Sequence, residues 1–436
     1  MIALKAGAVT GTASAALLLC SVTCHVAAAG DASTPAAGVE ITDMDSHASF
    51  GGPNSVASQI RSDEKPKSPV FDRDETPSTF QSYDDFKARL REEYGLTIGM
   101  DYNMLFQHAS ESPGEENAAG GVFRFFGRWT VLGEETGTPA SIEFKVENRH
   151  RLGTDIAPSA LAGEIGYAGL TAVPFSDAGW LLTNLYWHQS LNENRLAYIA
   201  GIVDVTDYVD VYGLVNPWTD FSNLAFSNDP TIPAPDQGLG AALRWSVDDH
   251  YYVLAGLADA NGDPSDPWDS VDTFFNDGEY FKHIEAGWHG SWDARFDDNI
   301  HLTLWQADER TQADIPDGWG VAFSFSKRIN ERWLPFLRIG YADGSGAVLE
   351  RSVSTGFAHY TPDKQGVFGL GLNWGRPNQD AFGMDARDQY TVEAYYRLQI
   401  ADHLTITPDI QLIKDPATNP DDDFLWVAGL RARLSF

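Results

Sequence analysis

The segment Phe424–Phe436, FLWVAGLRARLSF, alternates between two kinds of residue. Every second position from Trp426 to the end is apolar, whereas Arg431 and Arg433 lie at the positions between. A β-strand directs alternate side chains to opposite faces of its sheet. We therefore predict a strand with one apolar face, which needs a cover, and one cationic face.

Three earlier segments, residues 96–107, 123–131 and 142–149, repeat this alternation. Each carries its charged side chains on one face and apolar, often aromatic, side chains on the other. In a soluble β-sandwich the charged face would point outward, whereas in a membrane barrel the apolar face meets lipid and the charges line the lumen. The charged faces include Arg124, Arg128, Glu143, Lys145, Glu147 and Arg149.

The number of such windows favours the membrane barrel. Together with the first three segments, thirteen further windows make sixteen: 181–189, 195–204, 238–247, 250–258, 281–292, 299–307, 318–328, 332–342, 347–357, 365–374, 389–399, 403–413 and 424–436. A chain of about 350 residues, at roughly 20–22 residues for a strand and its connection, also gives about sixteen strands. We predict an all-β, antiparallel transmembrane β-barrel over residues 95–436, with both ends on the periplasmic side.

The connections are predicted to alternate in length. Short polar turns such as 246–250 and 296–299 are expected on the periplasmic side, and the long connections 152–180, 205–237, 261–280 and 375–388 on the other. Loop 205–237 is too long for a plain turn and is expected to narrow the lumen. Residues 80–94 predict a short periplasmic helix, capped by Ser82, ended by Gly95 and packed on the rim of the barrel.

The N-terminal residues 1–29 are typical of a secretory signal peptide, with Lys5, a short apolar run and the small residues 27–29 before Gly30. A retained membrane anchor and a lipoprotein modified at Cys20 are the alternatives. Both cysteines, Cys20 and Cys24, lie in this segment. Residues 30–79 are rich in Ala, Ser, Pro, Asp and Gly, which predicts a disordered or loosely packed periplasmic lead-in. After residue 29, no run is apolar enough for a helical membrane span.

The composition narrows the range of functions. The chain has 62 acidic and 30 basic residues and a formal charge of −32. This charge argues against nucleic acid as a partner, because phosphates require a basic face, and against an anion-specific pore. Tryptophans recur in or beside the predicted strands, where they suit the interfacial girdles of a barrel.

The sequence offers little for catalysis, a metal or a cofactor. We find no convincing nucleophile and base, so an outer-membrane enzyme such as a phospholipase is disfavoured. The group His283, Glu285 and His289 shares one strand face, and its members are interpreted as solvated lumen residues rather than metal ligands. The loop that starts at Asp259 lacks the glycine and glutamate that a calcium loop requires.

Candidate residues for a solute path lie on the predicted lumen face and in loop 205–237. Charges of both signs supply the donors and acceptors that polyhydroxylated solutes need; besides those above, they include Arg244, Arg431 and Arg433. In the loop, Trp218 offers an aromatic face for a sugar ring, and Asp220 and Asn223 offer directional polar groups. The alternative is that these loop residues pack on one another.

Residues 204–245 resemble the signature region of the carbohydrate-selective porins, the OprB family, above all in FSNLAFSNDPTIPAPDQGLGAALRW. The segments YGLTIGMDYN, GVFGLGLNWGRPN and VEAYYRLQIADHLTITPDIQLIKDP agree in the same order. The resemblance covers about residues 80–436 and implies a sixteen-stranded outer-membrane barrel that passes sugars down their gradient. Where the family commonly has Gly-Lys, this chain has Gly201-Ile202.

From these observations we expect an exported outer-membrane porin for the passive diffusion of mono- or small oligosaccharides, without an energy source or cofactor. The alternatives are a general cation-preferring porin and a structural or adhesive wall protein. The expected partners are carbohydrate solutes, outer-membrane lipid and the assembly machinery that would read the C-terminal Phe436. A homotrimer and a monomer are both compatible with this class.

Overall fold

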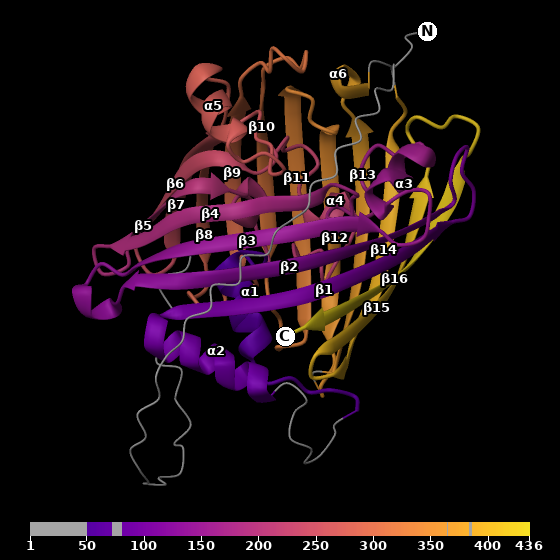
Figure 1. Ribbon diagram of the computed structural model, residues 1–436. Helices are drawn as coiled ribbons and strands as arrows, with labels where there is room; N and C mark the ends of the chain where they lie inside the picture. Colours follow the sequence, from indigo (N-terminus) through magenta and orange to yellow (C-terminus); the bar gives the residue numbers. More distant parts are fainter. Residues whose placement is uncertain (1–49, 72–80, 364, 383–385) are drawn as a thin grey trace, which may run out of the picture. The chain divides into compact units, whose positions relative to one another are not determined.

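The computed structural model describes residues 50–71, 81–363, 365–382 and 386–436. Its sixteen strands form one closed antiparallel barrel in which each strand pairs with its neighbours in the chain and the last strand pairs with the first (Figure 1). The predicted fold class and strand number are confirmed. The predicted signal peptide at residues 1–29 lies outside the described residues.

The strands match the predicted windows to within three residues at each end, except that β2 begins six residues before its window of 123–131. They are β1 (Leu96–Ala109), β2 (Asn117–Leu132), β3 (Ala140–Arg151), β4 (Gly179–Leu191), β5 (Leu196–Val203), β6 (Gly238–Ser246), β7 (Tyr251–Asp259), β8 (Tyr280–His289), β9 (Asn299–Ala307), β10 (Gly318–Ser326), β11 (Trp333–Gly344), β12 (Leu349–Tyr360), β13 (Gly366–Pro377), β14 (Gln389–Ala401), β15 (Leu404–Lys414) and β16 (Phe424–Ser435).

The barrel closes through β1 and β16, where Tyr102 lies opposite Leu434 and the Phe436 N–H donates to the Met100 carbonyl at 2.9 Å. Along β16 the predicted alternation holds, because Arg431 and Arg433 are buried inside the barrel while Leu430 is 53% exposed. Closure removes both edges of the sheet, which would otherwise expose unpaired backbone groups.

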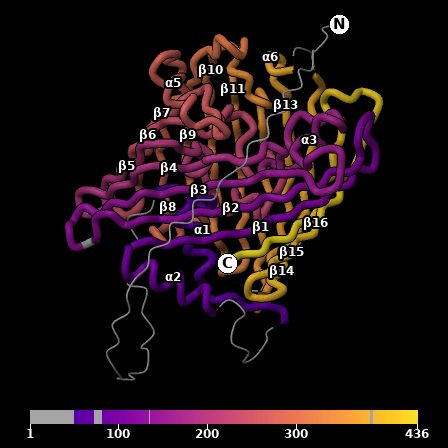
Figure 2. The backbone as a smooth tube through the Cα atoms, in the orientation of Figure 1, coloured from indigo at the N-terminus to yellow at the C-terminus, as the bar shows by residue number. Residues whose placement is uncertain are grey.

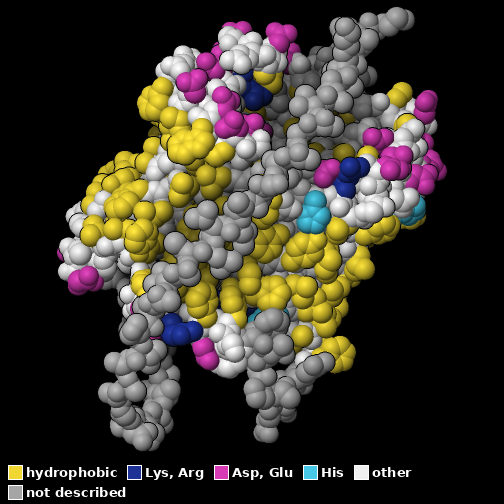
Figure 3. All heavy atoms as spheres, in the orientation of Figure 1, with side chains coloured by type: hydrophobic (Ala, Val, Ile, Leu, Met, Phe, Trp, Pro, Cys, Tyr) yellow, Lys and Arg dark blue, Asp and Glu magenta, His cyan; other side chains and the backbone are white. Residues whose placement is uncertain are grey.

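The outer surface of the barrel is apolar. On the face shown in Figure 3, apolar side chains cover the middle of the strands and acidic side chains gather beyond them. Trp129, Trp245 and Trp319 are exposed on the outside of the barrel, as a girdle requires. Trp305 is an exception to this expectation: it is only 3% exposed and stacks on Phe281 inside the barrel, because its position on β9 has the inward parity.

The two ends of the barrel differ. We call the end at which β1 starts and β16 finishes the N/C end, and the opposite end the loop end. Short turns join the strands at the N/C end, and the predicted long connections all lie at the loop end (Figure 2). The short helices are η1 (Glu134–Thr136), α3 (Pro158–Glu164), η2 (Val205–Asp207), α4 (Leu224–Ser227), α5 (Asp269–Asn276) and α6 (Gln379–Phe382).

In the described part of the chain before the barrel there are two helices, α1 (Val56–Glu64) and α2 (Gln81–Tyr94). The predicted helix 80–94 corresponds to α2, which ends at Gly95 with a φ of +65° and adjoins β1. Ser82 lies inside this helix rather than at its cap. Across the described residues, every helix falls short of the length and hydropathy of a membrane span.

Part of the predicted lead-in is ordered, contrary to our expectation for 30–79. Within residues 50–71, α1 packs inside the barrel against β1, β2 and β3, and its Val56 and Ile60 contact the inward-facing Phe126. The prediction of disorder relied on the absence of a long apolar stripe in this segment. It failed because a short helix inside a largely polar lumen does not need such a stripe. Residues 30–49 and 72–79 lie outside the described part of the chain.

Candidate functional site in the barrel lumen

The connection between β5 and β6, residues 204–237, folds back into the barrel. Its turns are set locally: Asp204 accepts a hydrogen bond from the Thr206 N–H and begins η2, and Asn223 accepts one from the Ala225 N–H and begins α4. Its apolar side chains pack on inward-facing wall residues, for example Tyr212 and Phe221 on Phe336. The lumen therefore has an apolar core of its own, made by this loop.

A buried ion pair holds the middle of the loop. Arg338 on β11 pairs with the carboxylate of Asp210, and the same carboxylate contacts the His301 Nε2 at 2.9 Å. Arg338 also donates to the Asn228 carbonyl at 2.7 Å. One wall arginine thus fixes two separate parts of the loop.

The later part of the loop is held by β14 and β16. Glu393 accepts hydrogen bonds from the backbone N–H groups of Ser222 at 2.8 Å and Asn223 at 3.0 Å. Arg397 donates to Asp220 at 2.8 Å, and Arg431 donates to the carbonyls of Pro217 and Asp220. The structure therefore places Asp220, Asn223 and Arg431 among the contacts that anchor the loop.

A cavity of about 450 Å³ lies beside this loop. The β3 residues Lys145, Glu147 and Arg149 form part of its wall, and Trp218 lines it from the loop. Loop-end residues such as Asp308 and Arg310 line it as well. Four of the twelve candidate residues from the sequence are thus brought together around one cavity: Lys145, Glu147, Arg149 and Trp218.

The cavity is strongly charged. Arg149 donates to Glu147 at 2.8 Å, and Lys145 donates to Asp207 of the loop at 3.1 Å. Burial raises the pKa of Asp207 to about 7, with the charge of Asp204 acting in the same direction and Lys145 opposing it. Burial likewise raises the pKa of Asp236, to which the charge of Asp204 adds. The carboxylates crowd one another, so a cation or a hydroxyl donor would be favoured beside them.

Trp218 is buried, with 2% of its surface exposed. Its indole N–H donates to Asn54 at 2.9 Å, its ring meets Phe175 edge-on, and the Arg124 guanidinium lies 4.0 Å from the ring centroid. The ring therefore presents only its edge to a solute in the cavity, and not an open aromatic face.

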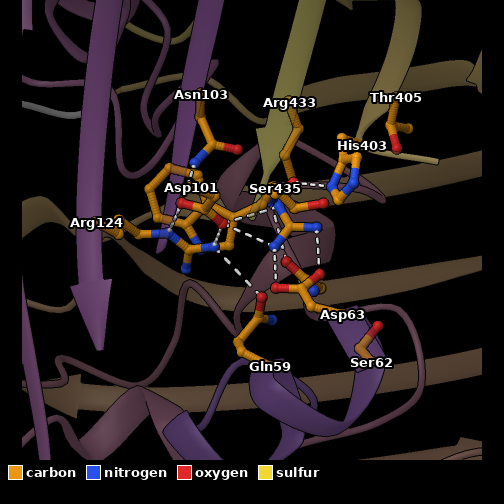
Figure 4. A network of polar contacts seen from close by, with 12 residues as sticks. Gln59, Ser62, Asp63, Asp101, Asn103, Arg124, His403, Thr405, Arg433 and Ser435 are labelled. Atoms are coloured by element: carbon orange, nitrogen blue, oxygen red, sulfur yellow. Dashed lines mark hydrogen bonds and ion pairs between the residues drawn. The ribbon is translucent and has the colours of Figure 1, made fainter. Parts of the chain in front are cut away.

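Residues 50–64 lie inside the barrel, on the side of the cavity toward the N/C end. We call Phe50–Glu64 the plug; its Asn54 lines the cavity, and its α1 lies deeper in the barrel. Figure 4 shows the polar network that holds it. Arg433 binds Asp63 of the plug at 2.8 Å and Asp101 of β1 at 2.9 Å. Arg124 binds the same Asp101 and contacts Gln59 of the plug at 3.3 Å.

The remaining candidates lie on the lumen wall away from the cavity. Arg128 lies 3.8 Å from Glu143, whose carboxylate also accepts from the Tyr186 hydroxyl at 2.9 Å. The Arg244 guanidinium lies over the rings of Tyr252, at 5.0 Å, and Trp292, at 4.3 Å.

Sequence reasoning missed the plug residues Asn54 and Asp63 and the loop residues Asp207 and Asp210. Asp207 and Asp210 lie within DVTDYVD at the start of the signature region, and their spacing of three could have suggested a role in the loop fold. Around His283, Glu285 and His289, the described residues contain no group of side chains suited to hold a metal ion. Glu285 instead accepts from Tyr252, Thr303 and the Asp210 N–H, each at 2.8 Å.

Comparison with known families gives one match, to the model described as "Carbohydrate-selective porin, OprB family", over residues 136–436. Among curated proteins, Porin AaxA of Chlamydia abortus is 21% identical over 260 residues, covering 58% of this chain and 57% of that protein. Porin AaxA of Chlamydia pneumoniae is 29% identical over 124 residues, covering 27% and 28%. The chain thus spans 57% of the length of the first relative and 28% of the length of the second.

Among solved structures, the chain is similar to the high-pH structure of Pseudomonas putida OprB, with a TM-score of 0.62 and 15% identity. The match covers 81% of this chain and 97% of that chain. The low-pH structure of the same protein gives a TM-score of 0.50 at 14% identity, covering 84% and 100%. At such identities the likeness shows the fold.

Proposed function

The chain belongs to the carbohydrate-selective porin, OprB family, and on this premise we propose that it lets monosaccharides or small oligosaccharides diffuse passively through its lumen. Family and fold indicate a porin of the outer membrane and point to a channel rather than an enzyme. The N/C end would face the periplasm, and residues 1–29 would direct export.

The cavity beside loop 204–237 is the observation that carries the proposal. Its volume of about 450 Å³ lies within the range of small-molecule sites, roughly 300–1,000 Å³. Lys145 and Arg149 supply donors, and carboxylates such as Asp204 and Asp229 supply acceptors. A sugar hydroxyl both donates and accepts, so groups of both kinds can replace its water shell.

Liposome swelling with sugars of graded size tests this function. Liposomes that contain the purified protein should swell with monosaccharides and more slowly as the sugar grows, because the loop and the plug narrow the lumen. The swelling of protein-free liposomes in the same sugar solutions sets the background. Failure to exceed that background with any monosaccharide would refute carbohydrate passage.

A general cation-preferring porin is the second candidate, and the charge of the cavity favours it. Six acidic residues line the cavity, Glu147, Asp204, Asp210, Asp229, Asp236 and Asp308, against three basic ones, Lys145, Arg149 and Arg310. Such an excess concentrates cations. Two measurements separate the functions: the reversal potential under a salt gradient reports cation selectivity, and the current with and without glucose reports sugar block. Strong cation selectivity with no block by sugar supports the second function.

We predict that Trp218→Ala weakens the block of ionic current by sugars more than it changes the current itself. An aromatic contact of about 0.5–1.5 kcal/mol corresponds to a rise of about two- to tenfold in the sugar concentration that gives half block. The matched control is Trp268→Ala, because Trp268 is 83% exposed beside α5. Equal sugar block in the wild type and in Trp218→Ala would show that this ring does not contact the solute.

A further inference from the structure

The helix α5 packs on the outer face of the barrel wall at the loop end. Its Thr273 donates to the carboxylate of Asp259 on β7, and its Phe274 ring lies 5.0 Å from the ring of Tyr280 on β8. Asp259 and Tyr280 lie directly opposite each other in the β7–β8 pair. Asp259 shares the outward parity of the exposed Leu257 and is nevertheless fully buried, because α5 covers it.

The apolar stripe of α5 is only partly covered by the protein. Trp268, Val271 and Phe275 recur at spacings of three and four, which places them on one side of the helix. Trp268 is 83% exposed and Phe275 is 72% exposed, whereas Ser270 on the wall side is buried. An amphipathic helix turns such a stripe toward an apolar environment. The stripe of α5 therefore needs a cover from outside the chain.

Polar side chains lie on another side of the same helix. Asp269 and Asn276 are seven residues apart, so they share a side, and both are exposed. The helix thus separates apolar from polar side chains, as helices that lie on a membrane surface do. Its polar side carries aspartates and no lysine or arginine. Binding to a membrane would therefore depend on burial of the apolar stripe rather than on attraction to anionic headgroups.

The stripe is continuous with the apolar outer surface of the barrel. Phe275 meets Phe274 edge-on at 5.1 Å, and Phe274 meets Tyr280 in the same way. Along the outer face of β8, Lys282 follows Tyr280, and Ile284, which is 48% exposed, comes next. A lysine among aromatic rings at the end of an apolar band is typical of the membrane–water boundary. Figure 3 also shows apolar side chains beside α5, next to the apolar band of the strands.

We propose that α5 binds the lipid surface around the loop end of the barrel, with Trp268 and Phe275 inserted at the boundary between headgroups and acyl chains. The helix is held on the outer face of the wall, at the level where Lys282 ends the apolar band. Helices of this kind bury their apolar side about 5–10 Å into that boundary. This interaction goes beyond the passage of solutes and requires only that the barrel lies in a membrane.

Site-directed fluorescence in lipid vesicles tests the insertion of α5. A bimane label is attached to Trp268→Cys in protein without other cysteines (Cys20→Ser and Cys24→Ser), which is reconstituted in phosphatidylcholine vesicles. The acyl chains are brominated near their headgroup end, because bromine quenches only fluorophores close to it. Asp269→Cys is the matched control, because it labels the polar side of the same helix. We expect lipid quenching to be about twofold or more stronger at position 268 than at 269, and quenching by aqueous iodide to show the reverse order.

A second labelled position keeps the test decisive. Phe275→Cys lies on the same stripe and should be quenched by the brominated lipid as position 268 is, and heat-dependent gel mobility checks that each variant is folded. Equal lipid quenching at positions 268, 269 and 275 would overturn the proposal. So would protection of the stripe from iodide without lipid quenching and only at high protein-to-lipid ratios, because that result assigns the stripe to a second copy of the chain.

Discussion

Deletion of the plug, residues 50–64, is expected to raise the single-channel conductance severalfold. A helix with its side chains is about 10–12 Å across, and α1 lies inside the lumen against β1, β2 and β3. A barrel of this strand number is wide enough for a water-filled channel, and α1 occupies the part of the lumen next to β1, β2 and β3. Removing the helix therefore opens the N/C end to ions.

Planar-bilayer recording of the deletion protein beside the wild type measures this effect. Asp63→Asn is a milder variant for comparison, because it removes the ion pair with Arg433 but keeps the helix. We expect intermediate conductance with more frequent transitions between levels. Gln81→Ala changes an exposed residue of α2 and should leave the current unaltered. A deletion protein that conducts as the wild type does would show that the plug does not limit the current.

Arg338→Met should release loop 204–237 from the wall. The substitution leaves the Asp210 carboxylate buried without its arginine, and breaking a buried pair in this way costs about 3–5 kcal/mol. The carbonyl of Asn228 loses its donor as well. We expect a lower midpoint of thermal unfolding in detergent, rapid cleavage by chymotrypsin at the aromatic residues of the loop, and a noisier open channel.

Arg328→Met is the matched control for this prediction. Arg328 of the β10–β11 turn pairs with Asp297 of the β8–β9 turn at 2.6 Å, but both side chains are partly exposed. Partly exposed pairs contribute about 1 kcal/mol or less, so this variant should resist chymotrypsin as the wild type does. Equal protease resistance of Arg338→Met and the wild type would show that the loop is held by other contacts.

The strands could be predicted from the sequence because lipid and lumen impose opposite polarity on the two faces of each one. Arg431, Arg433 and Arg124 therefore face inward as expected, and the windows agree with the strands in number and place. The side chains and segments that fill the lumen follow no such alternation of polarity. Trp305 is apolar and yet faces inward, because the folded loop and its neighbours give it an apolar surface to pack on.

The residues that the barrel wall contributes to the candidate site could be predicted from the sequence. The roles of the residues in loop 204–237 could be predicted only in part. Lys145, Glu147 and Arg149 follow directly from strand parity, and they line the cavity. Asp220 and Asn223 belong to the same short segment as Trp218, but their neighbours in space, Arg397 and Glu393, are more than 160 residues away in the chain. Contacts over such a separation leave no local pattern, so the anchoring role of these residues could not be seen in the sequence.

The ion pairs of Arg433 have a consequence for the order of assembly. Arg433 lies on the last strand, whereas its partners Asp63 and Asp101 precede it by 370 and 332 residues. Asp101 can meet Arg124 as soon as β1 and β2 form a hairpin, but Arg433 arrives only when β16 joins β1. The ion pair between Arg433 and Asp63 of the plug can therefore form only when the sheet closes, whereas the contacts of the plug with Arg124 and Phe126 of β2 can form earlier.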